Sequence, residues 1–402
     1  MTDTTRETTE LLHFPFAATT LFDPPPEFGM LRAADPVAEV LLPSGDRAWL
    51  VTRYEDVRQL LSDPRFSRAA ATRPGSPRLG PARPEPSSMM AMDPPDHTRL
   101  RKLVTPAFTR GRLERLRPRV QQVTDGLLDA MADAGPPADL VPLLARPLPI
   151  IVICEILGVP VRDRESFQQW TDTALTLAPD AATEVNVARG KLTVYLARLV
   201  DYKRGNPGDD LLSTLTAVAE DGDRLSEDEL VSLAGTLITA GYHTVANTFT
   251  NAVLGLLRHP EQLARLRAQP ELLANAVEEL LRWTPGSVSG GTLRIATEDV
   301  ELGGRLIRSG EAVLPSTTSG NRDAEAFPDP DLLDLARTGN RHIAFGPGIH
   351  HCLGAPLARI ELQLALGGLL TRFPGFRLDI DPARLVWGTG MIRGLTALPV
   401  AW

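Results

Sequence analysis

Apolar residues recur along most of this chain at the three- and four-residue spacing of amphipathic helices. This spacing predicts helices at about 97–108, 111–133, 142–156, 163–173, 184–204, 208–218, 226–258, 260–268, 270–283 and 352–373. A shorter helix is expected at 54–61, and runs rich in strand-forming residues predict strands at 48–52, 292–296 and 300–302. The pattern therefore predicts a mainly α fold with a minor β region.

The longest predicted helix, 226–258, has clear signals at both ends. Ser226 followed by Glu229 matches a capping box, and Pro260 marks the other end. About 32 residues at roughly 1.5 Å each give a rod of roughly 48 Å, enough to cross a whole domain. Gly241 lies in its middle. A helical glycine costs around 1 kcal/mol relative to alanine, so Gly241 indicates a close approach of another group or a local bulge.

The organisation of the chain favours one large domain. A composition of 43% hydrophobic residues over 402 positions provides ample core. The segment 73–86 is rich in proline without periodicity and is expected to be a long irregular loop, but helical patterns continue after it. We therefore expect a single domain over residues 1–402, with a flexible N-terminus at about 1–12.

Charge and cysteine content exclude several classes of protein. The net charge of −8 argues against a nucleic-acid partner, and no segment offers the roughly 18 uninterrupted apolar residues of a membrane span. Cys154 and Cys352 are the only cysteines, so a disulfide framework is not expected. These features predict a cytoplasmic protein without membrane association.

The candidate chemistry is concentrated in a glycine-punctuated loop, Phe345-Gly346-Pro347-Gly348-Ile349-His350-His351-Cys352-Leu353-Gly354. It brings one cysteine to the start of an apolar helix, where unpaired N–H groups and the helix dipole stabilise a thiolate. Glycines there tolerate left-handed backbone angles and the close approach of a flat macrocycle. We therefore predict that Cys352 is an iron ligand. Two alternatives are a buried free cysteine and a zinc site on His350, His351 and Cys352, although adjacent histidines are poorly spaced for tetrahedral zinc.

The pattern Phe-Gly-x-Gly-x-His-x-Cys-x-Gly resembles the haem-binding loop of the cytochrome P450 family, and all of its fixed positions are filled. The resemblance implies the triangular cytochrome P450 fold over essentially the whole chain. It also implies haem b as cofactor, with Cys352 as the axial thiolate ligand of the iron. The cofactor-binding residues of the loop would then be Phe345, Gly346, Gly348, His350 and Gly354.

The middle of the long helix resembles a second motif of that family, Ala-Gly-x-(Asp or Glu)-Thr. By resemblance, Thr244 holds dioxygen and its waters, while His243 stands where the family has a proton-relaying acid. Imidazole can replace that acid, because its unperturbed pKa is about 6.5, or it can fail to do so. In the alternative structural roles, the hydroxyl of Thr244 bonds to its own helix backbone and His243 is a core histidine satisfied by a carbonyl.

Two further groups of charged residues match the family. Glu279, Arg282 and Arg337 correspond to a buried structural network that precedes the cysteine loop. The two carboxylates of haem need charge-assisted donors, and four residues match such donors: His97, Arg101, Arg294 and His350. Taken singly, each of these residues could also be an ordinary solvated side chain.

The resemblance finally implies a monooxygenase that hydroxylates or epoxidises a bulky, largely apolar small molecule, such as a polyketide, macrolide or peptide natural product. The candidate substrate contacts are Met89, Leu237, Ala240, Val288, Ser289 and Ile392. For the first two of these, plain core packing is the alternative. Electrons would come from a ferredoxin and its reductase, docking near Arg101, Lys102 and Arg341, and we expect a monomer. Radical coupling, another oxidation without oxygen insertion, and a haem-binding sensor or carrier remain alternatives.

Overall fold

The structure is a computed structural model, and it describes residues 11–17, 23–79, 84–174, 181–217, 219–220, 223–284, 291–388 and 394–402. Most of the predicted flexible N-terminus and the middle of the proline-rich loop, residues 80–83, lie outside these ranges. The helices are α1 (Glu27–Ala34), α2 (Tyr54–Ser62), α3 (Asp96–Val104), α4 (Arg110–Glu114), α5 (Arg117–Ala134), α6 (Pro147–Leu157), α7 (Arg164–Ala174), α8 (Ala182–Gly205), α9 (Leu211–Ala217), α10 (Glu227–Leu257), α11 (Pro260–Ala268), α12 (Leu273–Trp283), α13 (Thr317–Gly320) and α14 (Ala355–Arg372).

The strands are short and form four small sheets within the described residues. They are β1 (Leu12–His13), β2 (Val37–Leu41), β3 (Arg47–Val51), β4 (Phe66–Ser67), β5 (Ala138–Asp139), β6 (Ala219–Glu220), β7 (Asp223–Arg224), β8 (Arg294–Ala296), β9 (Val300–Leu302), β10 (Arg305–Ile307), β11 (Ala312–Pro315), β12 (Arg377–Leu378) and β13 (Pro399–Ala401). The largest sheet has the order β1-β2-β3-β11-β8-β4. In it β11 runs parallel to β3 and antiparallel to β8.

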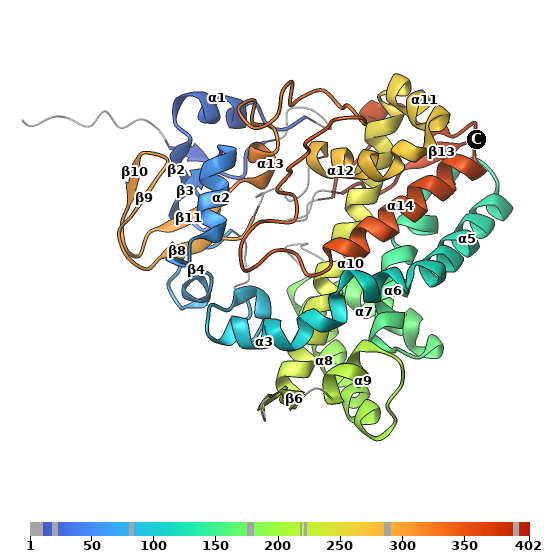
Figure 1. Ribbon diagram of the computed structural model, residues 1–402, viewed down its shortest axis with the longest axis horizontal. Coiled ribbons are helices and arrows are strands. Elements are labelled where there is room, and N and C mark those ends of the chain that lie inside the picture. Colours follow the sequence, from blue (N-terminus) through green and yellow to red (C-terminus); the bar gives the residue numbers. More distant parts are fainter. Residues whose placement is uncertain are drawn as a thin grey trace, which may run out of the picture.

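The sheet and the helices occupy different sides of the molecule (Figure 1). The six-stranded sheet and α2 lie on one side, and the helices α5, α6, α10 and α14 are packed together on the other. Helix α10 contacts α6, α8 and α14, and its buried residues belong to the largest apolar core. The prediction of a mainly α fold with a minor β region is confirmed.

Local signals placed the element boundaries with varying accuracy. Both reciprocal bonds of the capping box at Ser226 are present, and α10 runs without interruption from Glu227 to Leu257. The predicted helix 111–133 is instead divided into α4 and α5, with Pro118 in the first turn of α5, where proline is tolerated. The predicted helix 352–373 begins three residues late, at Ala355, because the cysteine loop continues to Gly354.

Candidate haem site

The loop that carries Cys352 is held by its own backbone and by α2. The amide of Cys352 donates to the carbonyl of Phe345 at 2.9 Å, which closes the loop. Gly346 and Gly348 have positive φ angles of 64° and 80°, a region that favours glycine. A Cβ at Gly348 would also lie 2.5 Å from the carbonyl oxygen of Leu61. The glycine at 348 is therefore required by packing against the C-terminal end of α2, as well as by its backbone angle.

The thiol of Cys352 lies just before the N-terminus of α14, and its side chain is exposed. Desolvation by the neighbouring protein atoms raises the pKa of this thiol, whereas the backbone N–H groups of Gly354 and Ala355 and the positive charges of Arg101 and Arg359 lower it. A bound metal cation would add the missing stabilisation of the thiolate. Gly354 has an ordinary φ of −82°, so it is not needed for a left-handed turn.

The four residues expected to bind carboxylates come from three parts of the chain and lie near one another at this loop. His97 from α3 and Arg294 from β8 are buried, and the rings of His97 and His350 are 4.2 Å apart. Arg101 donates to the carbonyl of His351 at 2.5 Å. The Nε atom of Arg294 and the Nε2 atom of His350 are buried, and neither finds a hydrogen-bond partner within the described residues. Burial, followed by the nearby positive charges, lowers the pKa of His350 to about 2.

The structure adds a fifth basic residue, Arg68, that the sequence analysis missed. Burial and the charge of Arg294 lower the pKa of Arg68 to about 9, and burial lowers that of Arg294 to about 10. Asp93 is the carboxylate that opposes these charges, and it already accepts hydrogen bonds from the hydroxyl of Ser67 and the amides of Arg68 and Ala69. This excess of buried donors, two of them without a partner, fits the two propionate carboxylates of haem.

Arg68 directly follows β4, which pairs with β8 through Phe66 and Ser67. This pairing places Arg68 near Arg294 although the two are far apart in sequence. No local pattern in the sequence marks such a contact, so only the pairing of these two strands could have identified Arg68.

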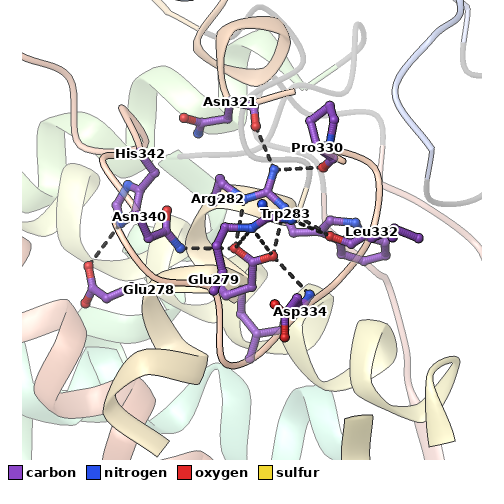
Figure 2. Close-up of polar contacts among 12 residues, drawn as sticks. Glu278, Glu279, Arg282, Trp283, Asn321, Pro330, Leu332, Asp334, Asn340 and His342 are labelled. Atoms are coloured by element: carbon purple, nitrogen blue, oxygen red, sulfur yellow. Dashed lines mark hydrogen bonds and ion pairs between the residues drawn. The ribbon is translucent and has the colours of Figure 1, made fainter. Parts of the chain in front are cut away.

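The three residues expected to form a structural network are in contact and buried. Arg282 of α12 donates to both oxygens of Glu279 at 2.8 Å, and the side chains of this pair are 0% exposed. Arg337 donates to the same carboxylate at 3.1 and 3.2 Å. Figure 2 shows how the surrounding segment completes the network, with bonds to Asn321, Pro330, Leu332, Asp334 and Asn340. Every charge is thus matched by several bonds, as a buried ion pair requires.

A neighbouring carboxylate, Glu278, connects this network to the cysteine loop. It accepts hydrogen bonds from His342 at 3.0 Å and from Arg359 of α14 at 2.7 and 2.8 Å. Burial opposes its ionisation, but these bonds outweigh burial and lower the pKa of Glu278 to about 2. The guanidinium of Arg359 also lies over the ring of Phe345, 4.6 Å from its centroid. Helix α12 is therefore coupled through Arg359 to Phe345, the first residue of the loop.

The second motif lies in the middle of α10. Thr244 is partly exposed, and its hydroxyl donates to the carbonyl of Ala240 at 2.5 Å. His243 does not bond to a carbonyl in the described residues. Its Nε2 atom instead lies 3.2 Å from Oδ1 of Asp172 on α7. A Cβ at Gly241 would lie 4.0 Å from the side chain of Ile153, an ordinary contact distance, and no bulge interrupts the helix.

The candidate substrate contacts are only partly described. Met89 and Leu237 are buried, whereas Ala240 is exposed. The segment carrying Met89 meets α10 directly, since the hydroxyls of Ser88 and Thr236 are 3.0 Å apart. Val288, Ser289 and Ile392 lie outside the described residues.

Comparison with known proteins identifies the family. Residues 41–383 match the sequence profile of the family described as Cytochrome P450. The chain belongs to the cytochrome P450 family. It is 50% identical to nocardicin C N-oxygenase of Nocardia uniformis subsp. tsuyamanensis over 98% of this chain and 99% of that protein. It is 47% identical to mycinamicin IV hydroxylase/epoxidase of Micromonospora griseorubida over 93% of this chain and 94% of that protein.

Solved structures agree with this assignment. The LnmA cytochrome P450 hydroxylase from the leinamycin biosynthetic pathway of Streptomyces atroolivaceus superposes with a TM-score of 0.92 at 46% identity, covering 98% of this chain and all of the other. The mixed-function P450 MycG gives a TM-score of 0.93 at 45% identity, over 98% and 100% of the two chains. The prediction of the cytochrome P450 fold is therefore confirmed. This P450 is a haem-dependent monooxygenase that uses O₂, a substrate and redox partners.

Two other sequence predictions can be compared with the described residues. No helix there is long and apolar enough to cross a membrane. No group of three or more His, Cys, Asp and Glu side chains there is arranged so that it could hold a metal ion. Cys154 and Cys352 are both free thiols.

Proposed function

We propose that this P450 hydroxylates or epoxidises a bulky, largely apolar natural-product intermediate of the polyketide, macrolide or peptide type. The observation that carries the proposal is the arrangement of Cys352 at the start of α14 beneath a buried cluster of cationic and imidazole donors. The names of its relatives support the substrate class, because they refer to nocardicin C and mycinamicin IV.

In the proposed site, Cys352 would bind the haem iron. His97, Arg101, Arg294 and His350 would hold the propionates, and Phe345 and the glycines of the loop would shape the surface that accepts the macrocycle. When bound, haem supplies the activation of O₂ and the oxidising power. Glu279, Arg282 and Arg337 hold the segment before the loop, so that the thiol keeps a fixed position.

Residues of α10 would handle the oxygen and the protons that the reaction needs. We assign the Thr244 hydroxyl to holding dioxygen and its waters, and the His243 imidazole to moving protons. The Thr244 hydroxyl already donates its own proton to Ala240, so its oxygen is left to accept a further hydrogen bond. Substrate would be bounded by Met89, Leu237 and Ala240, together with Val288, Ser289 and Ile392.

Electron supply and cellular context complete the proposal. A ferredoxin and its reductase would provide electrons, with the ferredoxin docking near Arg101, Lys102 and Arg341, of which Lys102 and Arg341 are exposed. We further propose that the protein acts as a monomer, as one domain, and in the cytoplasm.

A second function, radical coupling without oxygen insertion, has one specific observation in its favour. A P450 described as having biaryl coupling reactivity superposes with a TM-score of 0.90 at 42% identity. Product analysis with isotopically labelled O₂ separates the two functions, because only a monooxygenase places an oxygen atom in the product.

The first experiment is the carbon monoxide difference spectrum of the dithionite-reduced protein. A strongly red-shifted Soret band is expected for the wild type and for Cys154→Ala, but not for Cys352→Ala. Cys154 is the matched control because it is buried and burial raises its pKa to about 12, which opposes ligation as a thiolate. A band that is unshifted, or that survives Cys352→Ala, would refute the proposed site. A screen of natural products for spin-state shifts then identifies the substrate class.

A further inference from the structure

His243 has a carboxylate partner on another helix. It stands where the family has a proton-relaying acid. Nε2 of His243 on α10 lies 3.2 Å from Oδ1 of Asp172, two residues before the C-terminal residue of α7. A hydrogen bond from Nε2–H to this oxygen would fix the tautomer and orientation of the imidazole, in the way that carboxylates orient histidines elsewhere. The acid absent from α10 is thus replaced by an acid from α7.

The surroundings of the pair restrict the imidazole on a second side. The rings of Tyr242 and His243 are 4.5 Å apart in an edge-on arrangement. Tyr242 is fully buried, and its hydroxyl lies near the side chains of Asp172 and Gln168. Burial, followed by the negative charge of Asp172 and the hydrogen bond with its carboxylate, raises the pKa of Tyr242, while Arg146 and Gln168 act in the opposite direction. Tyr242 therefore stays neutral, and Asp172 is the acid in contact with the imidazole.

Of the two side chains in the pair, that of Asp172 is more exposed to solvent than that of His243. The side chain of Asp172 is 37% exposed and that of His243 is 26% exposed. Thr244 follows directly on α10. Solvent therefore reaches the pair from the side of Asp172, and the imidazole is the less exposed member, on the residue before Thr244.

We propose that Asp172 is a positioning residue that holds His243 as the proton-relay group of this P450. Asp172 accepts the Nε2 proton and pairs with the imidazolium when the ring is charged, so that Nδ1 is the atom that gives or takes a proton. This inference rests on the proposed function of the site, and it assigns the role of the family's acid to a pair of residues from two helices.

The test compares Asp172→Asn and Asp172→Glu with the matched control Asp163→Asn. Asp163 lies just before α7 and accepts from Tyr195, a contact that does not involve α10. Imidazole ¹⁵N spectra of the haem-loaded, ferrous carbonmonoxy protein are assigned with His243→Gln. We expect His243 to carry its proton on Nε2 in the wild type, in Asp163→Asn and in Asp172→Glu, and to become a mixture of tautomers in Asp172→Asn.

A kinetic readout uses NADPH oxidation with a saturating surrogate ferredoxin and its reductase, in H₂O and D₂O. Loss of the relay should slow oxidation about tenfold or more and increase the solvent isotope effect, both in Asp172→Asn and in His243→Gln. The double variant should be no slower than His243→Gln alone, because the two residues act as one unit. An unchanged tautomer, or losses that add in the double variant, would overturn the inference. The carbon monoxide spectrum stays normal in that case, so failure here is distinct from failure of the proposed function.

Discussion

The carboxyl group of Glu361 offers a quantitative test of how this fold treats a buried acid. Glu361 lies in α14, only 2% exposed, and its Oε2 atom has no hydrogen-bond partner within the described residues. With Val245 and Phe249 of α10 and with Leu362, it lines a small, mostly apolar cavity. Burial raises the pKa of Glu361 to about 8, so the group is mainly neutral at neutral pH. Glu361→Gln keeps the shape of this neutral form and removes its titration.

The sign and size of the effect follow from linkage. Because the folded-state pKa of about 8 lies above the ordinary 4.5, the folded protein binds this proton more tightly than the unfolded chain does. The stabilising contribution is fully present below about pH 4.5 and is lost as pH rises through about 8. At about 1.4 kcal/mol per pH unit, the wild type should lose on the order of 4 kcal/mol across this window, whereas Glu361→Gln loses nothing at this site.

The assay is urea unfolding of the haem-loaded wild type and Glu361→Gln at a series of pH values from about 5 to about 9, followed by circular dichroism. The difference between the two proteins cancels every other titrating group. We expect similar free energies of unfolding near pH 5 and a clear advantage for Glu361→Gln near pH 9. Parallel curves over the whole range would refute the reasoning, because they would show that Glu361 does not take up its proton on folding.

The remaining predictions concern the buried ion pair and the cysteine loop. Glu279→Gln leaves Arg282 buried without a full counter-charge, so urea unfolding should show a loss of about 3–5 kcal/mol, and a loss within error of zero would contradict the role of the network. Gly348→Ala places a Cβ against a backbone carbonyl of α2 at a φ of 80°, which should cost about 1–3 kcal/mol and reduce haem occupancy as measured by the Soret-to-protein absorbance ratio. Gly339→Ala has a similar φ of 65° but meets no atom within 4 Å and is the matched control, so equal losses in the two alanine variants would show that the clash at Gly348 is not the cause.

Features determined by near neighbours in sequence were predictable. The capping box at Ser226 and the strand Val300–Leu302 were predicted at the positions where the structure has them, because each depends on a few adjacent residues. The start of α14 was predicted three residues early, because the apolar periodicity extends into the cysteine loop. Backbone bonds within that loop, such as the one from Cys352 to Phe345, compete with a helical start there.

Two residues of the candidate site could not have been found in this way. Arg68 reaches the cationic cluster only because β4 pairs with β8, a contact that joins distant parts of the chain. Asp172 lies on the partly exposed face of an amphipathic helix, where a carboxylate usually contacts only solvent. The packing of α7 near α10, which the sequence pattern does not specify, makes it the partner of His243. Periodicity gives the faces of each helix, but it does not say which faces meet.

The buried ionisable groups of this P450 also differ in what they require from the cofactor. Glu279 has its counter-charges within the protein, and Glu361 avoids the cost of burial by staying neutral. Arg68 and Arg294 are neither fully paired with counter-charges nor easily neutralised. Burial works against both charges, and Asp93 is already bonded elsewhere. Two propionate carboxylates would offset that cost, so binding of haem and stability of the fold are linked at this cluster. On the proposed haem site, cations that are unfavourable in the protein alone would become a source of affinity for the cofactor.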